Sequence, residues 1–191
     1  MLLSLVFLAG LNTPLEDERQ FDGRHRTTEA PRLRATVRVG ASQEQSETRQ
    51  ELCLSVSPVT RWSLESCGTG AGFLSPTSAS PDLAHFRLRY RAWSRNTQRG
   101  WLFAGLQAGF AELEIGEDDP GFHFSSVGPR GLETAGPSAG ASLRWTRPLR
   151  RGLHFIGEFN TNLAYFPHAP DLQRPLSIWH PSLSLSIGLG F

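Results

Sequence analysis

The chain has 191 residues, which suits a single domain, and its net charge of +1 gives no electrostatic basis for a nucleic-acid partner. With 19 glycines, 13 prolines and one methionine, its composition is typical of many short strands and turns rather than of helices. No apolar run reaches the roughly 18 residues that a transmembrane helix requires. The sequence therefore predicts an all-β fold.

The N-terminus begins with an apolar run, LLSLVFLAGL at residues 2–11, which is too short to span a bilayer but matches the hydrophobic region of a secretory signal peptide. Ala9 and Gly10 are small residues suited to cleavage, but no Lys or Arg precedes the run. Residues 1–11 are therefore predicted to be a signal peptide that is either truncated or begins upstream; a buried strand or helix is the alternative. Residues 12–30 are charged and aperiodic, which predicts a flexible lead-in.

Eight segments then alternate apolar and polar side chains with the period of two that indicates a β-strand with two different faces. They cover residues 32–40, 52–57, 62–69, 86–93, 101–110, 138–145, 155–163 and 181–191. Pro58 is expected to end the second segment, since proline cannot donate to a strand ladder. The connections are alternately long and short, beginning with the long polar run 42–50. Such regular alternation is typical of a transmembrane barrel with both chain ends on one side.

The last segment has the strictest alternation in the chain. Its apolar face carries Leu183, Leu185, Ile187, Leu189 and Phe191. Only serine and glycine occupy the other face. Lipid on one face and a wet, small-residue interior on the other would produce this pattern.

This terminal segment resembles the C-terminal targeting strand of bacterial outer-membrane β-barrels, which finishes in Phe. With the eight segments and their connections, the chain is similar to the small barrels of the OmpA/OmpX type over residues 31–191. The resemblance implies an eight-stranded antiparallel up-and-down transmembrane β-barrel in the bacterial outer membrane, with residues 12–30 in the periplasm. It also implies contact with outer-membrane lipids, insertion by the barrel assembly machinery and a monomeric state.

Aromatic residues fall near both ends of the predicted strands, as in the girdles of membrane barrels. The ends beside the short turns carry Trp62, Trp93, Trp101, Trp145 and Phe191. The ends beside the long connections carry Phe73, Phe110, Tyr165, Phe166 and Trp179. The strand phase points Trp93 and Trp101 inward, where they would close the lumen.

The same phase directs a set of charged residues into the lumen: Arg34, Arg38, Arg87, Arg89, Arg91, Arg144, Glu65 and Glu158. A charge facing hydrocarbon would cost about 2–4 kcal/mol, so a membrane barrel must place them inside. We expect a hydrogen-bonded network that fills the lumen, because eight strands leave little room for a channel. The excess of arginine leaves open a narrow anion-selective pore lined by Arg87, Arg89 and Arg91.

The two cysteines fit one hairpin. A turn centred on residue 60 places Cys53 opposite Cys67, both inward, and Val56 opposite Leu64, both outward. Directly opposed residues come within disulfide range, and the periplasm is oxidising, so a structural disulfide is predicted. Two free buried thiols are the alternative; neither the cysteines nor the scattered histidines have the spacing of a metal site.

The predicted function is non-enzymatic, a structural or surface-interaction role without cofactor or metal. One alternative is a lipid-modifying hydrolase, since His123-Phe-Ser125 resembles the His-x-Ser motif of outer-membrane lipid A deacylases, although Ser126 stands where that family has Asn. Such a His–Ser pair could carry out acyl transfer. Another is a soluble lipocalin-like barrel, in which Leu183, Leu185, Ile187 and Leu189 would line a ligand cavity.

Overall fold

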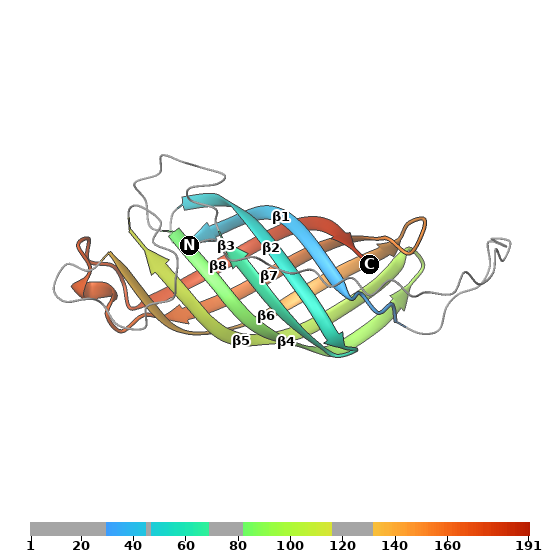
Figure 1. The fold of residues 1–191 in the computed structure, drawn as a ribbon, viewed down its shortest axis with the longest axis horizontal. Helices are drawn as coiled ribbons and strands as arrows, with labels where there is room; N and C mark the ends of the chain where they lie inside the picture. Colours follow the sequence, from blue (N-terminus) through green and yellow to red (C-terminus); the bar gives the residue numbers. More distant parts are fainter. Residues whose placement is uncertain (1–29, 45–46, 69–81, 116–131) are drawn as a thin grey trace, which may run out of the picture.

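The computed structural model describes residues 30–44, 47–68, 82–115 and 132–191. The strands are β1 (Ala35–Glu44), β2 (Glu47–Val59), β3 (Trp62–Gly68), β4 (Asp82–Thr97), β5 (Gly100–Glu114), β6 (Glu133–Pro148), β7 (His154–Tyr165) and β8 (Trp179–Gly190), with a short 3-10 helix η1 (Ala169–Asp171) between β7 and β8 (Figure 1). The signal peptide and the lead-in lie outside the described residues and remain predictions. In the described ranges, no helix is both long and apolar enough to cross a membrane.

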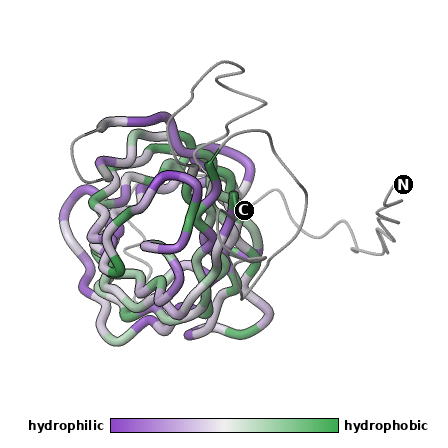
Figure 2. Tube along the Cα trace, turned by 90° about the vertical axis from the view of Figure 1, so that its left-hand side faces the viewer, coloured by the Kyte–Doolittle hydropathy of each residue, from purple (hydrophilic) through white to green (hydrophobic). Residues whose placement is uncertain are grey.

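Each strand pairs antiparallel with its neighbour in the sequence, and β8 pairs with β1 to close the sheet. Figure 2 looks along the long axis and shows the chain running around a ring. The chain ends of β1 and β8 meet, because Ala35 and Phe191 exchange backbone hydrogen bonds at 3.1 Å. The predicted eight-stranded antiparallel up-and-down barrel is confirmed.

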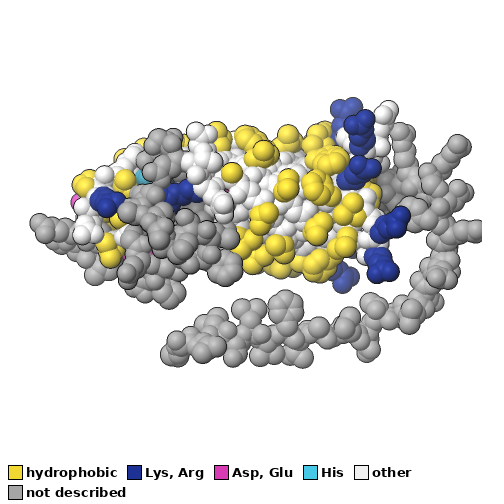
Figure 3. All heavy atoms as spheres, turned by 90° about the horizontal axis from the view of Figure 1, so that it is seen from above, with side chains coloured by type: hydrophobic (Ala, Val, Ile, Leu, Met, Phe, Trp, Pro, Cys, Tyr) yellow, Lys and Arg dark blue, Asp and Glu magenta, His cyan; other side chains and the backbone are white. Residues whose placement is uncertain are grey.

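The period-two alternation decides which side chains face outward. In β8, Leu185 is 64% exposed, whereas its neighbours Ser184 and Ser186 are 6% and 1% exposed. The same division holds around the barrel, and the outward apolar side chains form a band over its middle, drawn yellow in Figure 3. The lipocalin-like alternative is wrong, because it required the leucines of β8 to point inward.

The first hairpin differs from its prediction. The polar run 42–50 was expected to be a loop, but β1 continues to Glu44 and β2 begins at Glu47, with Ala41 opposite Gln50. Partner strands on both sides of β1 supply its backbone hydrogen bonds, so pairing overrides the polar side chains. The first connection is therefore short, and the alternation of long and short connections fails there. Pro58 does not end β2 either; the strand passes it through a register shift between Val56 and Val59.

Trp93 was predicted to point inward, but a β-bulge in β4 places it on the outward face. The register steps from Arg91 opposite Gly105 to Trp93 opposite Ala104, which inserts one residue into β4. Beyond the bulge the phase is reversed, so Trp93 points outward and is 45% exposed. Trp101 is half-buried and stacks on buried Phe103, with ring centroids 6.3 Å apart.

A small apolar core fills the lumen at the end away from the short turns. It comprises Leu83, Ala111, Leu113, Ile115, Ala164, Phe166, Ala169 and Leu172. Phe166 was expected in an aromatic girdle, but η1 and its flanks fold inward, and Phe166 is fully buried with its ring edge-on to His180. We call this group the apolar cap.

Candidate functional site

Six charged side chains from five strands meet in the middle of the lumen. They are Arg38 of β1, Glu65 of β3, Arg87 and Arg89 of β4, Arg144 of β6 and Glu158 of β7. The sheet register places Glu65 directly opposite Arg87, and Arg144 directly opposite Glu158. We call this group the lumen network. It contains most of the charged residues that the sequence predicted to be inward.

The two glutamates are the centres of the lumen network. Arg38 spans the barrel and pairs with Glu65 through one terminal nitrogen and with Glu158 through the other. Arg89 Nη1 also pairs with both carboxylates, at 2.8 Å from Glu158 Oε1. Arg87 Nη2 lies 3.1 Å from Glu65 Oε1, and Arg144 Nε pairs with Glu158 Oε2. Each carboxylate is therefore shared among several guanidinium groups.

Burial makes these contacts energetically important. The side chains of Arg38, Glu65 and Glu158 have no exposed surface. A buried charge is tolerated when it is paired and hydrogen-bonded, and losing one partner leaves the other uncompensated. A conducting path must be wetted, so side chains with no exposed surface in the middle of the lumen argue against a continuous channel.

Glycine at position 188 makes room for Arg38. The two residues are opposite each other in the β1–β8 ladder. A Cβ atom at Gly188 would lie 2.7 Å from Arg38 Cγ and would also strike the backbone of β1. The small residues on the inward face of β8 thus allow an arginine to cross the lumen.

Sequence reasoning missed Glu51, which is 3% exposed and shares the inward face of β2 with Cys53 and Ser55. The Glu51 carboxyl group lies close to the two cysteine sulfurs, one of which accepts a hydrogen bond from Arg87, so it lies beside the network. It was missed because residues 42–50 were assigned to a loop and the second strand was started at Leu52. Extending the inward phase of that strand by two residues would have found it.

Two predicted members lie outside the network. Arg34 precedes β1, which begins at Ala35 rather than at residue 32, and its side chain is exposed. Arg91 is inward but lies two residues beyond Arg89, nearer the short turns, with its guanidinium carbon 5.1 Å from the centre of the Phe103 ring. The three arginines predicted to line an anion pore therefore lie in two different environments: Arg87 and Arg89 belong to the lumen network, and Arg91 does not.

Cys53 and Cys67 are joined by a disulfide, directly opposite each other in the β2–β3 register, with their Cα atoms 4.1 Å apart. Arg87 Nη2 donates to Cys67 Sγ at 2.9 Å, so the disulfide touches the lumen network. Glu51 and the two sulfurs lie close together. Because the metal-binding form of cysteine is the thiolate, the disulfide removes this trio as a metal site.

His123 and Ser125 of the hydrolase alternative lie outside the described residues, as does Phe73 of the predicted girdle.

Comparisons with known proteins support the architecture. The N-terminal β-barrel domain of OprF from Pseudomonas aeruginosa matches with a TM-score of 0.52 and 11% identity, over 85% of this chain and 100% of that domain. Ail, the attachment invasion locus protein of Yersinia pestis, solved with the heparin analogue sucrose octasulfate, matches with a TM-score of 0.36 and 13% identity, over 82% of this chain and 97% of that one. No protein-family model matches the chain, and the search of curated proteins gives no match. The chain shares the eight-stranded barrel fold of the OprF domain.

Proposed function

We propose that this protein is a monomeric barrel of the bacterial outer membrane with a structural or surface-interaction role, and that the lumen network closes its interior. The observation that carries the proposal is the distribution of side chains in the barrel, which is apolar outside and charged inside, the reverse of a soluble protein. Leucine, valine and phenylalanine side chains face outward over its middle, whereas buried arginines and glutamates face inward. Soluble monomers rarely expose apolar patches larger than a few hundred Å². A membrane barrel requires such an outward band.

Closure of the barrel supports the monomeric state. Pairing of β8 with β1 leaves no free sheet edge, so the backbone needs no partner chain to satisfy its hydrogen bonds. The turns after β2, β4 and β6 and both chain ends would face the periplasm, whereas the short β1–β2 turn lies at the opposite end. The longer connections after β3, β5 and β7 would face the exterior, where a surface interaction would take place. Insertion by the barrel assembly machinery and removal of residues 1–11 belong to the same proposal.

The test is membrane fractionation of cells that express the protein, followed by electrophoresis of unboiled and boiled samples. The proposal predicts recovery in the outer membrane and faster migration without boiling, because a closed barrel stays compact in detergent. Intact mass of the purified protein locates the cleavage site. Recovery in the soluble fraction without a mobility difference would refute the proposal.

A further inference from the structure

The lumen contains a second group of arginines in a cavity of about 560 Å³ between the lumen network and the short β2–β3 turn. The N-terminal residues 31–34, the β2–β3 hairpin and inward residues of β4, β5 and β6 line this cavity, which we call the vestibule. Its volume lies within the range of small-molecule sites.

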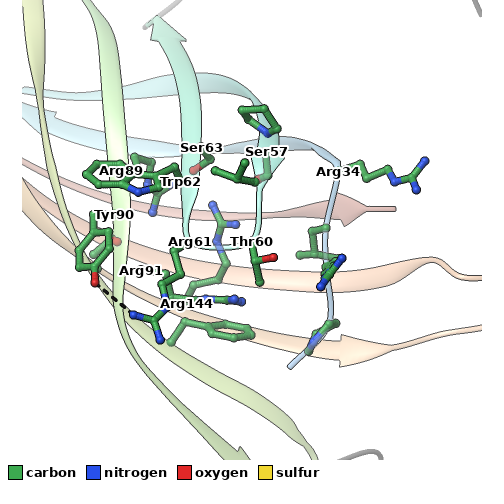
Figure 4. Close-up of a pocket in the computed structure, with 18 of the residues that line it drawn as sticks. Arg34, Ser57, Thr60, Arg61, Trp62, Ser63, Arg89, Tyr90, Arg91 and Arg144 are labelled. Carbon is green, nitrogen blue, oxygen red and sulfur yellow. Dashed lines mark hydrogen bonds between the residues drawn. The ribbon is translucent and has the colours of Figure 1, made fainter. Parts of the chain in front are cut away.

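Among the described residues, the charged side chains of the vestibule wall are all positive. They are six arginines, of which Arg89 and Arg144 also belong to the lumen network: Arg32, Arg34, Arg61, Arg89, Arg91 and Arg144. Figure 4 shows Arg61, Arg91 and Arg144 gathered on one side, whereas Arg34 extends away from them. Hydroxyl groups of Ser57, Thr60 and Ser63 supply further hydrogen-bond donors in the wall.

Several of these guanidinium groups lack an acidic partner. Within the described residues, no carboxylate pairs with Arg32, Arg34, Arg61 or Arg91. Arg144 belongs to the lumen network, because it pairs with Glu158 through Nε and its buried Nη2 lies 4.0 Å from Glu65 Oε2. Among the described residues, the cavity arginines without an acidic partner are therefore those nearer the short β2–β3 turn and the N-terminal residues 31–34.

Arg61 and Arg91 are placed against each other by the backbone. The Arg91 N–H donates to the Arg61 carbonyl at 2.8 Å, directly after the Trp62–Tyr90 pair of the β3–β4 ladder. Like charges opposite each other across strands are destabilising. Arg61 Nη1 donates to Tyr90 Oη at 3.5 Å, and the Arg91 guanidinium group lies over the ring of Phe103. An anion between the two guanidinium groups would remove this repulsion.

We propose that the vestibule is a binding site for a phosphate-bearing anion, with Arg61 and Arg91 as its outer ligands. Phosphate suits this wall because several oxygens can accept from separate guanidinium forks and hydroxyl groups at once. The ligand is either a free phosphate compound or the headgroup of a phospholipid. This inference goes beyond the proposed role and requires only a folded barrel, so it is tested independently of localisation.

The test measures binding of inorganic pyrophosphate to the folded protein in zwitterionic detergent by calorimetry, with tryptophan fluorescence as a second readout because Trp62 lines the cavity. The R61Q/R91Q double variant removes the outer ligands and leaves the lumen network intact. The matched control is R147Q/R150Q, which removes the same charge from exposed positions outside the cavity. At about 0.1 M salt the Debye length is about 10 Å, so distant charges contribute little.

We expect one pyrophosphate per barrel, at least tenfold weaker binding in R61Q/R91Q and less than a twofold change in R147Q/R150Q. The mobility difference between unboiled and boiled samples checks that each variant is folded. No binding by the wild type, or equal losses in both variants, would overturn the site. Adding dihexanoyl-phosphatidylglycerol distinguishes the two sources. If this lipid displaces pyrophosphate, the ligand is a phospholipid headgroup; if pyrophosphate stays bound in the presence of the lipid, the ligand is a free phosphate compound.

Discussion

The middle of the lumen and its short-turn end contain the same kind of residue in opposite circumstances. In the lumen network, arginines from three strands surround Glu65 and Glu158, whose side chains have no exposed surface. In the vestibule, Arg61 and Arg91 border a cavity to whose wall the described residues contribute no acidic side chain. Charge that is buried must be neutralised by the protein itself, whereas charge beside a cavity is available to a ligand. We therefore assign stability to the first group and binding to the second.

The largest effect should follow from removing a carboxylate at the centre of the network. Glu158→Gln leaves Arg38, Arg89 and Arg144 facing each other without that charge, and we expect a loss of about 3–5 kcal/mol. Urea unfolding in phosphatidylcholine vesicles, followed by tryptophan fluorescence, measures it. The double variant R144Q/E158Q should lose less unfolding free energy than the sum of the two single variants, because it leaves neither Arg144 nor Glu158 as a buried charge without the other. Strict additivity would show that the pair is not coupled.

A smaller effect is expected from the disulfide beside the network. Replacing Cys53 and Cys67 by serine opens a loop of about 15 residues and should lower the unfolding free energy by about 3 kcal/mol. The control compares the effect of a reducing agent on the two proteins: it should destabilise the wild type by a similar amount and leave the stability of C53S/C67S unchanged. If reduction had no effect on the wild type, the disulfide would contribute nothing to stability.

The smallest effect should come from the vestibule and should have the opposite sign. Arg91→Gln removes one of two opposed positive charges, so without added anion we expect a gain of up to about 1 kcal/mol in the same urea titration. With pyrophosphate present, the wild type should become more stable than R91Q, because it binds the anion more tightly. A loss of several kcal/mol in R91Q would place Arg91 in the structural network instead.

Local alternation was enough to predict the barrel and several of its contacts. Leu183 to Phe191 indicated the outward face of β8, and a turn centred on residue 60 paired Cys53 with Cys67 in the observed register. The inward positions of Arg38, Arg87, Arg89 and Arg144 followed from phase alone. These features depend on period and register, which a strand carries in its own sequence.

The remaining features depend on neighbours. Trp93 turned outward because of a bulge that strand phase cannot reveal, and Phe166 was drawn inward by the apolar cap. Glu51 was missed because backbone pairing extended β2 through a polar segment. The sequence did not indicate a role for Arg61, since its proximity to Arg91 and to the cavity arises only when β3 and β4 pair and the barrel closes.

The most direct test of the account is whether the outward band faces lipid. Leu185→Arg introduces a charge at the most exposed position of that band, and Leu149→Arg makes the same change in the β6–β7 turn. Unfolding in vesicles should show a loss of about 2–4 kcal/mol for L185R and of less than about 1 kcal/mol for L149R, because the cost of a charge depends on its depth in the bilayer. Equal and small effects of the two substitutions would contradict a membrane-spanning barrel.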